Sequence, residues 1–432
     1  MTKNKNRRFF TALVLFGLIG QVAWVVENMY FNVFIYNMFS ASPADISLMV
    51  AASSVIATVT TVLIGALSDR LGKRRLFISL GYILWGVSIL LFALVRKDII
   101  GALFPAAVSV SAVCITITIV LDCLMTFFGS TANDAAFNAW LTDAADPRRR
   151  GAIEGINAMM PLVAILVVFG GFMSFDLSTA SAWTTVFVII GAVVLLSGVL
   201  SILLVDEPER TVKANEGYLK TVLYSFRPST VKKNALLYAV LLAFAVFGIS
   251  IQIFMPYLII YYEVALGMKD YVFVMAPAII LASVATAFYG KVYDRLGFLR
   301  SVLPALGVLS LGYILLILFR ATVPVFISSL FMMTGYLSGM AVFGAMLRDR
   351  IPEGKAGAFQ GIRIVGQVLI PGMIGPAIGA FVLRNAETMV GGDGTESFIP
   401  NESIFIAALV VAALAVLTAF LAHTVEKKKA KN

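Results

Sequence analysis

Histidine and cysteine are almost absent from this chain of 432 residues, which contains one histidine and two cysteines. His423 lies at the end of the last apolar run, and Cys114 and Cys123 lie within apolar runs, with no spacing typical of a metal site or a disulfide framework. No phosphate-binding glycine-rich loop of an ATP-driven pump occurs either. We therefore expect no cofactor, no metal and no enzyme active site.

Charged residues are also scarce. They make up 13% of the chain, hydrophobic residues make up 60%, and the mean hydropathy is +0.94. A soluble protein of this composition would expose a large apolar surface. Lipid must be the solvent for most of the chain, and because apolar runs of about 20 residues recur, membrane-spanning helices are expected and barrel strands are not. The first run is too long for a cleavable signal peptide.

Twelve spans are expected. They cover about residues 9–39, 43–67, 76–95, 117–141, 152–172, 182–205, 235–262, 271–292, 301–319, 324–347, 358–383 and 403–422. Residues 206–234 are polar and charged. The predicted domains are therefore an N-terminal six-helix bundle over residues 1–205, a cytoplasmic linker over 206–234, and a C-terminal six-helix bundle over 235–432.

Two motifs occur twice, once in each half. Gly65-Ala-Leu-Ser-Asp-Arg-Leu-Gly-Lys-Arg-Arg75 is echoed by Gly290-Lys-Val-Tyr-Asp-Arg-Leu-Gly-Phe-Leu-Arg300 after 225 positions, and Gly151-Ala-Ile-Glu-Gly-Ile156 by Gly357-Ala-Phe-Gln-Gly-Ile362 after 206. The chain is therefore two related halves. Because the offset falls by 19, the first half holds 19 extra residues between its motifs. We place them near residues 98–116, as an outer-face helix, a re-entrant segment or an extension of the fourth span.

Lysine and arginine are unevenly distributed. With twelve spans, 27 of the 33 lie on the side of both termini, five lie on the other side and Arg363 lies inside a span. Cytoplasmic loops carry the excess of these residues, so a multi-pass protein of a cell (inner) membrane with both termini in the cytoplasm is predicted. The same distribution explains the net charge of +9 as topology, and no nucleic-acid partner is expected.

An ionisable residue inside a span costs roughly 3 kcal/mol or more unless it is paired or hydrated, so each one points to function. Glu27 lies about midway along the first span, with Trp24 and Asn28 beside it. A carboxylate accepts hydrogen bonds from sugar hydroxyls, and an indole packs against the apolar face of a sugar ring. These residues are therefore substrate-binding candidates. A hydrogen-bond cluster between helices is the alternative.

Asp134 lies inside the fourth span, roughly 13 Å from its end, beside Asn133 and with Asn138 one turn away. Burial disfavours a charged carboxylate, which suits the reversible protonation that proton coupling requires. The alternative is an acid permanently paired with a base. Asp122, near the outer end of the same span, is interpreted as a rim residue or a solvated one.

Arg363 lies roughly 9 Å inside the eleventh span. It could be the counter-ion of Asp134, bind an anionic substrate group, reach the inner face or join a gate, and these interpretations stay open. The second half adds weaker binding candidates in Gln252, Tyr257 and Tyr336, for which a position at the lipid interface is the alternative.

The two six-span halves, the long linker and the doubled Gly-x-x-x-Asp-Arg-x-Gly-x-x-Arg motif resemble the major facilitator superfamily. Glu27-Asn-Met-Tyr-Phe-Asn32, Asn133-Asp134 and the following Asp-Pro-Arg-Arg-Arg-Gly run are similar to the glycoside–pentoside–hexuronide:cation symporters and the sucrose transporters. The resemblance implies an all-α membrane protein of twelve transmembrane helices in two pseudo-symmetric bundles. It also implies alternating access about a site near the membrane midplane.

The resemblance further implies a role for the charged residues of the doubled motif. Asp69 and Arg70 in the first half, and Asp294 and Arg295 in the second, would form gates that hold the inner side shut. Solvated loop charges that only set the topology are the alternative.

Sodium-coupled members of the resembling group carry acids in the second span, at positions where this chain has Ala57 and Thr61. Coupling to H⁺ is therefore favoured over coupling to Na⁺. We predict a monomeric secondary active transporter of a small polar solute, a sugar or glycoside, with Glu27 and Asp134 as the coupling residues. The alternative is a multidrug or metabolite exporter that works as a proton antiporter.

Overall fold

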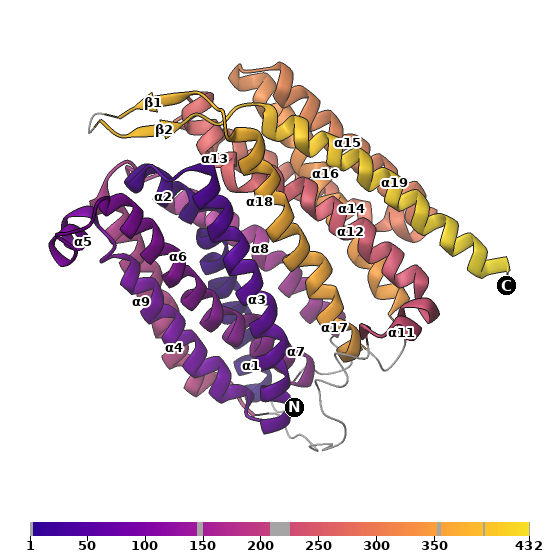
Figure 1. The fold of residues 1–432 in the computed structure, drawn as a ribbon. Helices are drawn as coiled ribbons and strands as arrows, with labels where there is room; N and C mark the ends of the chain where they lie inside the picture. Colours follow the sequence, from indigo (N-terminus) through magenta and orange to yellow (C-terminus); the bar gives the residue numbers. More distant parts are fainter. Residues whose placement is uncertain (1–2, 145–149, 208–224, 352–355, 392–393, 432) are drawn as a thin grey trace. The chain divides into compact units, whose positions relative to one another are not determined.

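The computed structural model describes residues 3–144, 150–207, 225–351, 356–391 and 394–431, and most of this part is helical (Figure 1). In it, 11 helical runs are long and apolar enough to cross a membrane. The remaining predicted span corresponds to α8 (Arg150–Phe172), whose apolar stretch among the described residues, Met159–Phe172, is shorter. The prediction of an all-α membrane protein is confirmed.

The first compact unit comprises Met1–Asp45 and Val55–Asn215. Besides α8 and most of α3 (Pro43–Leu71), its helices are α1 (Lys3–Val25), α2 (Phe31–Phe39), α4 (Arg74–Phe92), α5 (Lys97–Leu103), α6 (Val110–Gly129), α7 (Asn138–Ala144) and α9 (Ala180–Leu204). Within it α4 packs against α9 and α6, and α1 packs against α8 and α9.

The second unit comprises Ile46–Ser54 and Glu216–Asn432. Its helices are α11 (Pro228–Lys233), α12 (Ala235–Phe254), α13 (Leu258–Ile260), α14 (Val272–Leu296), α15 (Phe298–Leu318), α16 (Thr322–Arg350), α17 (Ala356–Ile364), α18 (Ile370–Leu383) and α19 (Ser403–Lys431). An antiparallel hairpin of β1 (Thr388–Val390) and β2 (Glu396–Phe398) precedes α19. The helix pairs of the first unit recur, since α15 packs against α19 and α16, and α12 against α18 and α19.

The doubled motif contains a helix end in each unit. α3 begins at a capping box in which Ser42 and Asp45 cap each other's backbone N–H groups, at 3.2 and 2.9 Å. It ends at Gly72, whose φ of +66° lies in the left-handed region that glycine adopts without strain. Gly297, the counterpart of Gly72 in the second half, has a φ of +75° at the end of α14.

Glycine also permits close helix packing. A Cβ added to Gly86 on α4 would lie 2.6 Å from the Cα of Leu195 on α9. A Cβ on Gly312 of α15 would lie 2.6 Å from the Cα of Met332 on α16. In both cases the obstacle is backbone, which cannot move aside as a flexible side chain can.

The substitution Gly86→Leu is expected to lower the free energy of unfolding by roughly 1–3 kcal/mol, because α4 and α9 must separate to admit the side chain. Thermal unfolding in detergent measures the effect. Gly170→Leu is the matched control, since a Cβ placed there would have no heavy atom of the described residues within 4 Å beyond its chain neighbours and the backbone of its own helix. Equal unfolding temperatures for the two variants would contradict this view of the α4–α9 contact.

The 19-residue excess of the first half has a definite structure. It forms the short helix α5, a turn and additional residues at the start of α6, which begins at Val110 and not near residue 117. Two of the three expected alternatives, a separate helix and a longer fourth span, are thus combined. Figure 1 shows α5 at the end of the first unit that is remote from the N terminus.

In the part of the chain that the structure describes, four helical runs contain π-helical segments that were not predicted from the sequence. They are Val26–Tyr30, Ser130–Phe137, Tyr261–Ala265 and Val365–Leu369. Such segments are frequent at functional sites, because the wider turn re-aims side chains. The first contains Glu27, and the second contains Asn133 and Asp134.

Candidate functional site

The polar centre of the first unit lies where its first span meets α6 and the π-helical segment after it. The two helices run antiparallel to each other. Three close pairs of residues define their register: Gly20–Asn133, Trp24–Gly129 and Glu27–Thr126. In the third pair the Thr126 hydroxyl donates to Oε1 of Glu27 at 2.9 Å. The two glycines let the helices approach, so residues far apart in sequence form one site.

Asn133 is held in place from α4. Its Nδ2 donates to the hydroxyl of Tyr82 at 2.7 Å, and that hydroxyl donates to the carbonyl of Phe16 at 2.8 Å. All three residues are buried. Tyr82, which the sequence analysis missed, therefore sets the orientation of a predicted binding residue.

Two carboxyl groups of the site are almost completely buried, Glu27 at 7% exposed and Asp122 at 2%. Asp122 lies one turn from Thr126 on the same face of α6, close enough for its charge to act on Glu27. Oε2 of Glu27 and Oδ1 of Asp122 have no hydrogen-bond partner among the described residues. A buried carboxylate without a partner is costly, so both groups favour a proton, a cation or a hydroxyl donor.

The interpretation of Asp122 as a rim or solvated residue is wrong. Because α6 begins at Val110, Asp122 lies three turns inside the helix and not near its start. Its side chain contributes to the buried site.

Two tryptophans complete the site. The rings of Trp24 and Trp85 lie 5.0 Å apart beside Gly129, and Tyr82 lies 5.5 Å from Trp85. The indole N–H groups of both tryptophans have no acceptor in the part of the chain that is described. Donors, acceptors and aromatic faces thus converge, as binding of a hydroxylated ring or an organic cation requires.

The remaining predicted residues of this unit are placed as follows. Asp134 is half-buried and its Oδ2 accepts from the Ser130 hydroxyl at 3.0 Å, with no lysine or arginine paired to it in the described part of the first unit. Asn28 and Asn138 are exposed, and each donates to a carbonyl one turn earlier on its own helix, Trp24 at 2.7 Å and Asp134 at 3.4 Å.

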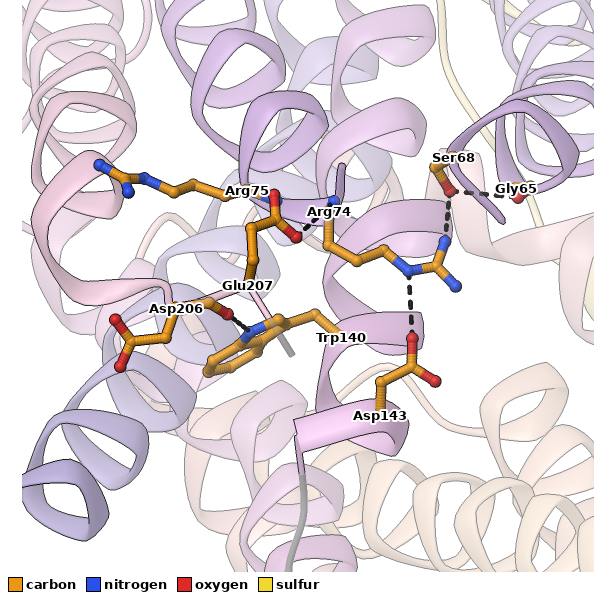
Figure 2. Close-up of polar contacts among 8 residues, drawn as sticks. All are labelled: Gly65, Ser68, Arg74, Arg75, Trp140, Asp143, Asp206 and Glu207. Carbon is orange, nitrogen blue, oxygen red and sulfur yellow. Dashed lines mark hydrogen bonds and ion pairs between the residues drawn. The ribbon is translucent and has the colours of Figure 1, made fainter. Parts of the chain in front are cut away.

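A second polar cluster lies at the start of α4, and Figure 2 shows Arg74 at its centre. Arg74 is 1% exposed, its Nε donates to Asp143 at 3.2 Å, and its Nη1 donates to the hydroxyl of Ser68. The Glu207 carboxylate accepts from the backbone N–H groups of Arg74 and Arg75 at 3.1 and 2.9 Å, where the dipole of α4 favours a negative charge. This cluster of Ser68, Arg74, Asp143 and Glu207, the arginine cluster, connects α3, α4, α7 and the segment after α9.

A sequence model of the Major Facilitator Superfamily matches residues 9–362, which is most of the chain. The chain belongs to the Major Facilitator Superfamily. No curated protein matches its sequence. The family prediction is therefore confirmed, while the narrower resemblance to glycoside–pentoside–hexuronide:cation symporters and sucrose transporters stays a prediction.

Solved structures share the superfamily fold. The nucleoside transporter NupG is 12% identical, with a TM-score of 0.68, over 96% of this chain and 98% of that one. The xylose transporter XylE from E. coli is 15% identical, with a TM-score of 0.67, over 95% and 99%. A bacterial homologue of the human lysosomal transporter Spinster, inward-facing and unoccupied, is 17% identical, with a TM-score of 0.67, over 98% and 97%. At these identities the likeness concerns the fold alone.

In this superfamily transporter the predicted gate residues whose side chains are described are exposed, and none of them is buried. Arg70 is exposed at the end of α3, Asp294 and Arg295 are exposed at the end of α14, and the side chain of Asp69 lies outside the described residues. Among the described residues, the buried cation is Arg74, which was not predicted from the sequence. Its partner Asp143 recurs in the second half, and that recurrence was the available signal.

The second half of the transporter has a contact equivalent to the arginine cluster, but a hydrogen bond takes the place of the ion pair. Asp349, the counterpart of Asp143, accepts a hydrogen bond from the Tyr293 hydroxyl at 2.6 Å. Tyr293 occupies the repeat position of Ser68, and Leu299 occupies that of Arg74. A phenol therefore replaces the buried ion pair.

The predicted binding residues of the second unit lie on different helices. Gln252 on α12 and Tyr336 on α16 are half-buried. Tyr257 is buried and donates to the carbonyl of Pro376 at 3.4 Å, so its position inside the unit differs from that of a lipid-interface tyrosine. Arg363 is exposed on α17, and its Nε donates to Oε1 of Gln367 at 3.1 Å.

Proposed function

We propose that this transporter moves a small hydroxylated solute, a sugar or glycoside, by proton-coupled alternating access. The observation that supports this most is the site of Glu27, Asp122, Trp24 and Trp85. Among the described residues, its two indole N–H groups and one carboxyl oxygen of each acid lack hydrogen-bond partners. A sugar ring offers hydroxyls for these groups and an apolar face for an indole.

The fold relatives agree with this substrate class. XylE is named for xylose and NupG for nucleosides, and both kinds of solute contain a pentose. Asn133, fixed by Tyr82, would add a side-chain carbonyl to the first-half site. Asn28, Asn138, Gln252, Tyr257, Tyr336 and Arg363 remain proposed contributors from both halves.

Coupling is assigned to Glu27 and Asp134. A carboxyl group inside a membrane protein is less costly when protonated, and no base in the described part of the first unit neutralises either group. Loading with a proton and with solute can therefore depend on each other. Asp69, Arg70, Asp294 and Arg295 are assigned to gates at the cytoplasmic ends of the helices, with both termini in the cytoplasm and the monomer as the working unit.

A second candidate function is export of organic cations in exchange for protons. The observation that favours it is the combination of two buried acids without a base and two tryptophan rings, which suits a cation as well as a sugar. The two functions differ in the charge of the solute and in its direction relative to the proton.

Proteoliposomes with an imposed pH gradient separate the two functions. Uptake of labelled xylose, a disaccharide, a nucleoside and a lipophilic cation would be measured with and without a protonophore. We expect a sugar or glycoside to accumulate on the alkaline side of the membrane, because it moves in the same direction as the proton. The protonophore should abolish this accumulation. Movement of the cation alone, against the proton, would establish the exporter and reject the sugar proposal.

A further inference from the structure

Asn32, at the start of α2, is a buried polar residue that the proposed transport site does not use. Its side chain is 0% exposed, and its Nδ2 donates to the carbonyl of Asn28 at 3.1 Å. Because the amide nitrogen is engaged in this way, the free end of the side chain is the oxygen. This Oδ1 has no hydrogen-bond partner among the described residues. A buried amide oxygen without a donor is costly, so Asn32 indicates that a donor binds beside it.

The register of the two antiparallel helices places Asn32 opposite Asp122. Their reference point is the hydrogen bond from Thr126 to Glu27. Asp122 lies four residues before Thr126, which is one α-helical turn. Asn32 lies five residues after Glu27, which is one turn of the π-helical segment between them. Since α2 also packs against α6, Glu27, Asp122 and Asn32 form one group, the acceptor cluster.

The acceptor cluster contains three buried oxygen atoms that lack a donor in the part of the chain that is described. They are Oε2 of Glu27, Oδ1 of Asp122 and Oδ1 of Asn32. Glu27 and Asp122 are also close enough for their charges to act on each other. Two ionised carboxylates in a medium of low dielectric constant repel strongly, and neither of them can donate a hydrogen bond to Asn32.

The neighbouring elements bring no charge that neutralises the acceptor cluster. In the described part, α2, α4, α5, α6 and the π-helical segment after it carry these further titratable groups: Tyr36, Arg74, Arg75, Tyr82, Lys97, Asp98, Cys114, Cys123 and Asp134. Both arginines lie at the start of α4, where Arg74 meets Asp143, 21 residues from Asp122. Lys97 acts on Cys114, eight residues or about 12 Å from Asp122 along α6. Asp134 adds a negative charge that acts on Glu27.

We propose that Asp122 holds a proton of its own and donates it to Asn32, so that the acceptor cluster binds two protons. Protonated Glu27 donates from Oε2 to the carboxyl group of Asp122, and protonated Asp122 donates from Oδ1 to the amide oxygen of Asn32. All three oxygen atoms are then engaged and no buried charge remains. A proton needs no cavity, which agrees with side chains that are at most 7% exposed. Asn32 is a positioning residue, because it acts through Asp122.

The consequence for transport rests on the proposed function. With coupling through Glu27 alone, release of the proton changes the charge of the site by one. With a second proton on Asp122, the charge changes by two, and Asp122 becomes a coupling residue in addition to Glu27 and Asp134.

Infrared difference spectroscopy of the purified full-length protein, between neutral and alkaline buffer, tests the proposal. A protonated carboxyl group has a carbonyl stretch that disappears on ionisation, and isotope-labelled aspartate separates the aspartate bands from those of glutamate. We expect Asp122→Asn to lose one aspartate band and Glu27→Gln to lose one glutamate band. Asp270→Asn is the control, since this exposed acid is ionised at neutral pH and its loss should leave the bands unchanged.

The role of Asn32 is tested on the same aspartate band. Asn32→Leu removes the acceptor and should shift the band that Asp122→Asn abolishes. Asn37→Leu, at an asparagine of α2 that donates to the carbonyl of Leu177, should not shift it. Should Asn32→Leu aggregate on size-exclusion chromatography, the smaller apolar variant Asn32→Val replaces it.

Two results would overturn the proposal. Aspartate bands that are the same in Asp122→Asn and in the unmodified protein would show that Asp122 holds no proton. A band of Asp122 that vanishes at constant pH when sodium chloride replaces choline chloride would assign the acceptor cluster to a sodium ion. No solute is present, so the result is independent of whether the transporter moves a sugar.

Discussion

Replacing Arg74 by methionine is expected to lower the free energy of unfolding by about 3–5 kcal/mol, the usual cost of removing one partner from a buried ion pair. Arg74 is 1% exposed and joins Asp143 to Ser68, so its loss removes a buried ion pair and a hydrogen bond where three helices meet. Thermal unfolding in detergent reports the change.

The chain offers a matched control for this arginine. Arg320 pairs with Glu402 at 2.6 Å, but their side chains are 50% and 38% exposed. Water screens such a pair, so Arg320→Met should cost no more than about 1 kcal/mol. The double variant Arg74→Met with Asp143→Leu should recover most of the loss, because an apolar pair of similar volume often replaces a buried ion pair at little cost. Equal losses for Arg74→Met and Arg320→Met would show that burial of the first pair contributes nothing.

Glu27→Gln is expected to abolish solute accumulation driven by a pH gradient and to raise the unfolding temperature at neutral pH. The amide keeps the hydrogen bond from Thr126 but cannot take up and release a proton. It also removes a carboxyl group that is 93% buried and has one oxygen without a partner among the described residues, which is a cost to the fold. Loss of coupling together with a gain in stability is the signature of a group kept for function.

Uptake in proteoliposomes and thermal unfolding would be measured on the same preparations. Asp134→Asn should also lose pH-driven accumulation, while Asp270→Asn, an exposed acid of the second unit, should retain it. Solute exchange without a gradient should survive in Glu27→Gln, which separates lost coupling from lost binding. If Glu27→Gln and Asp134→Asn both accumulate solute normally, the coupling assignment is wrong.

The superfamily could be predicted because its signals are local or periodic. Long apolar runs indicate that lipid is the solvent. The duplicated motif indicates the repeat, because a helix end with positive φ, as at Gly72 and Gly297, favours glycine in both halves. The fourth span was predicted less well. Asp98 to Thr116 is apolar enough to fit several topologies, and composition does not show where a helix begins.

Some residues of the candidate site could be predicted from the sequence, and others could not. Glu27 and Asp134 stand out in any apolar span because a charge there is costly wherever it points. Asp122 was misplaced, and Tyr82 and Trp85 were missed, because their importance arises from the register of α1 against α6 and from the approach of α4.

By itself, the sequence determined that the chain is a duplicated bundle of membrane helices with a few acids inside its spans, because hydropathy, repeats and charge bias are properties of residues in order along the chain. Only the tertiary structure decided that Arg74, and not Arg70, is buried, that Asp122 joins Glu27, and that Asn32 is buried with an amide oxygen that lacks a partner among the described residues. Burial and partnership depend on which helix faces meet, and that is settled by packing between residues distant in sequence.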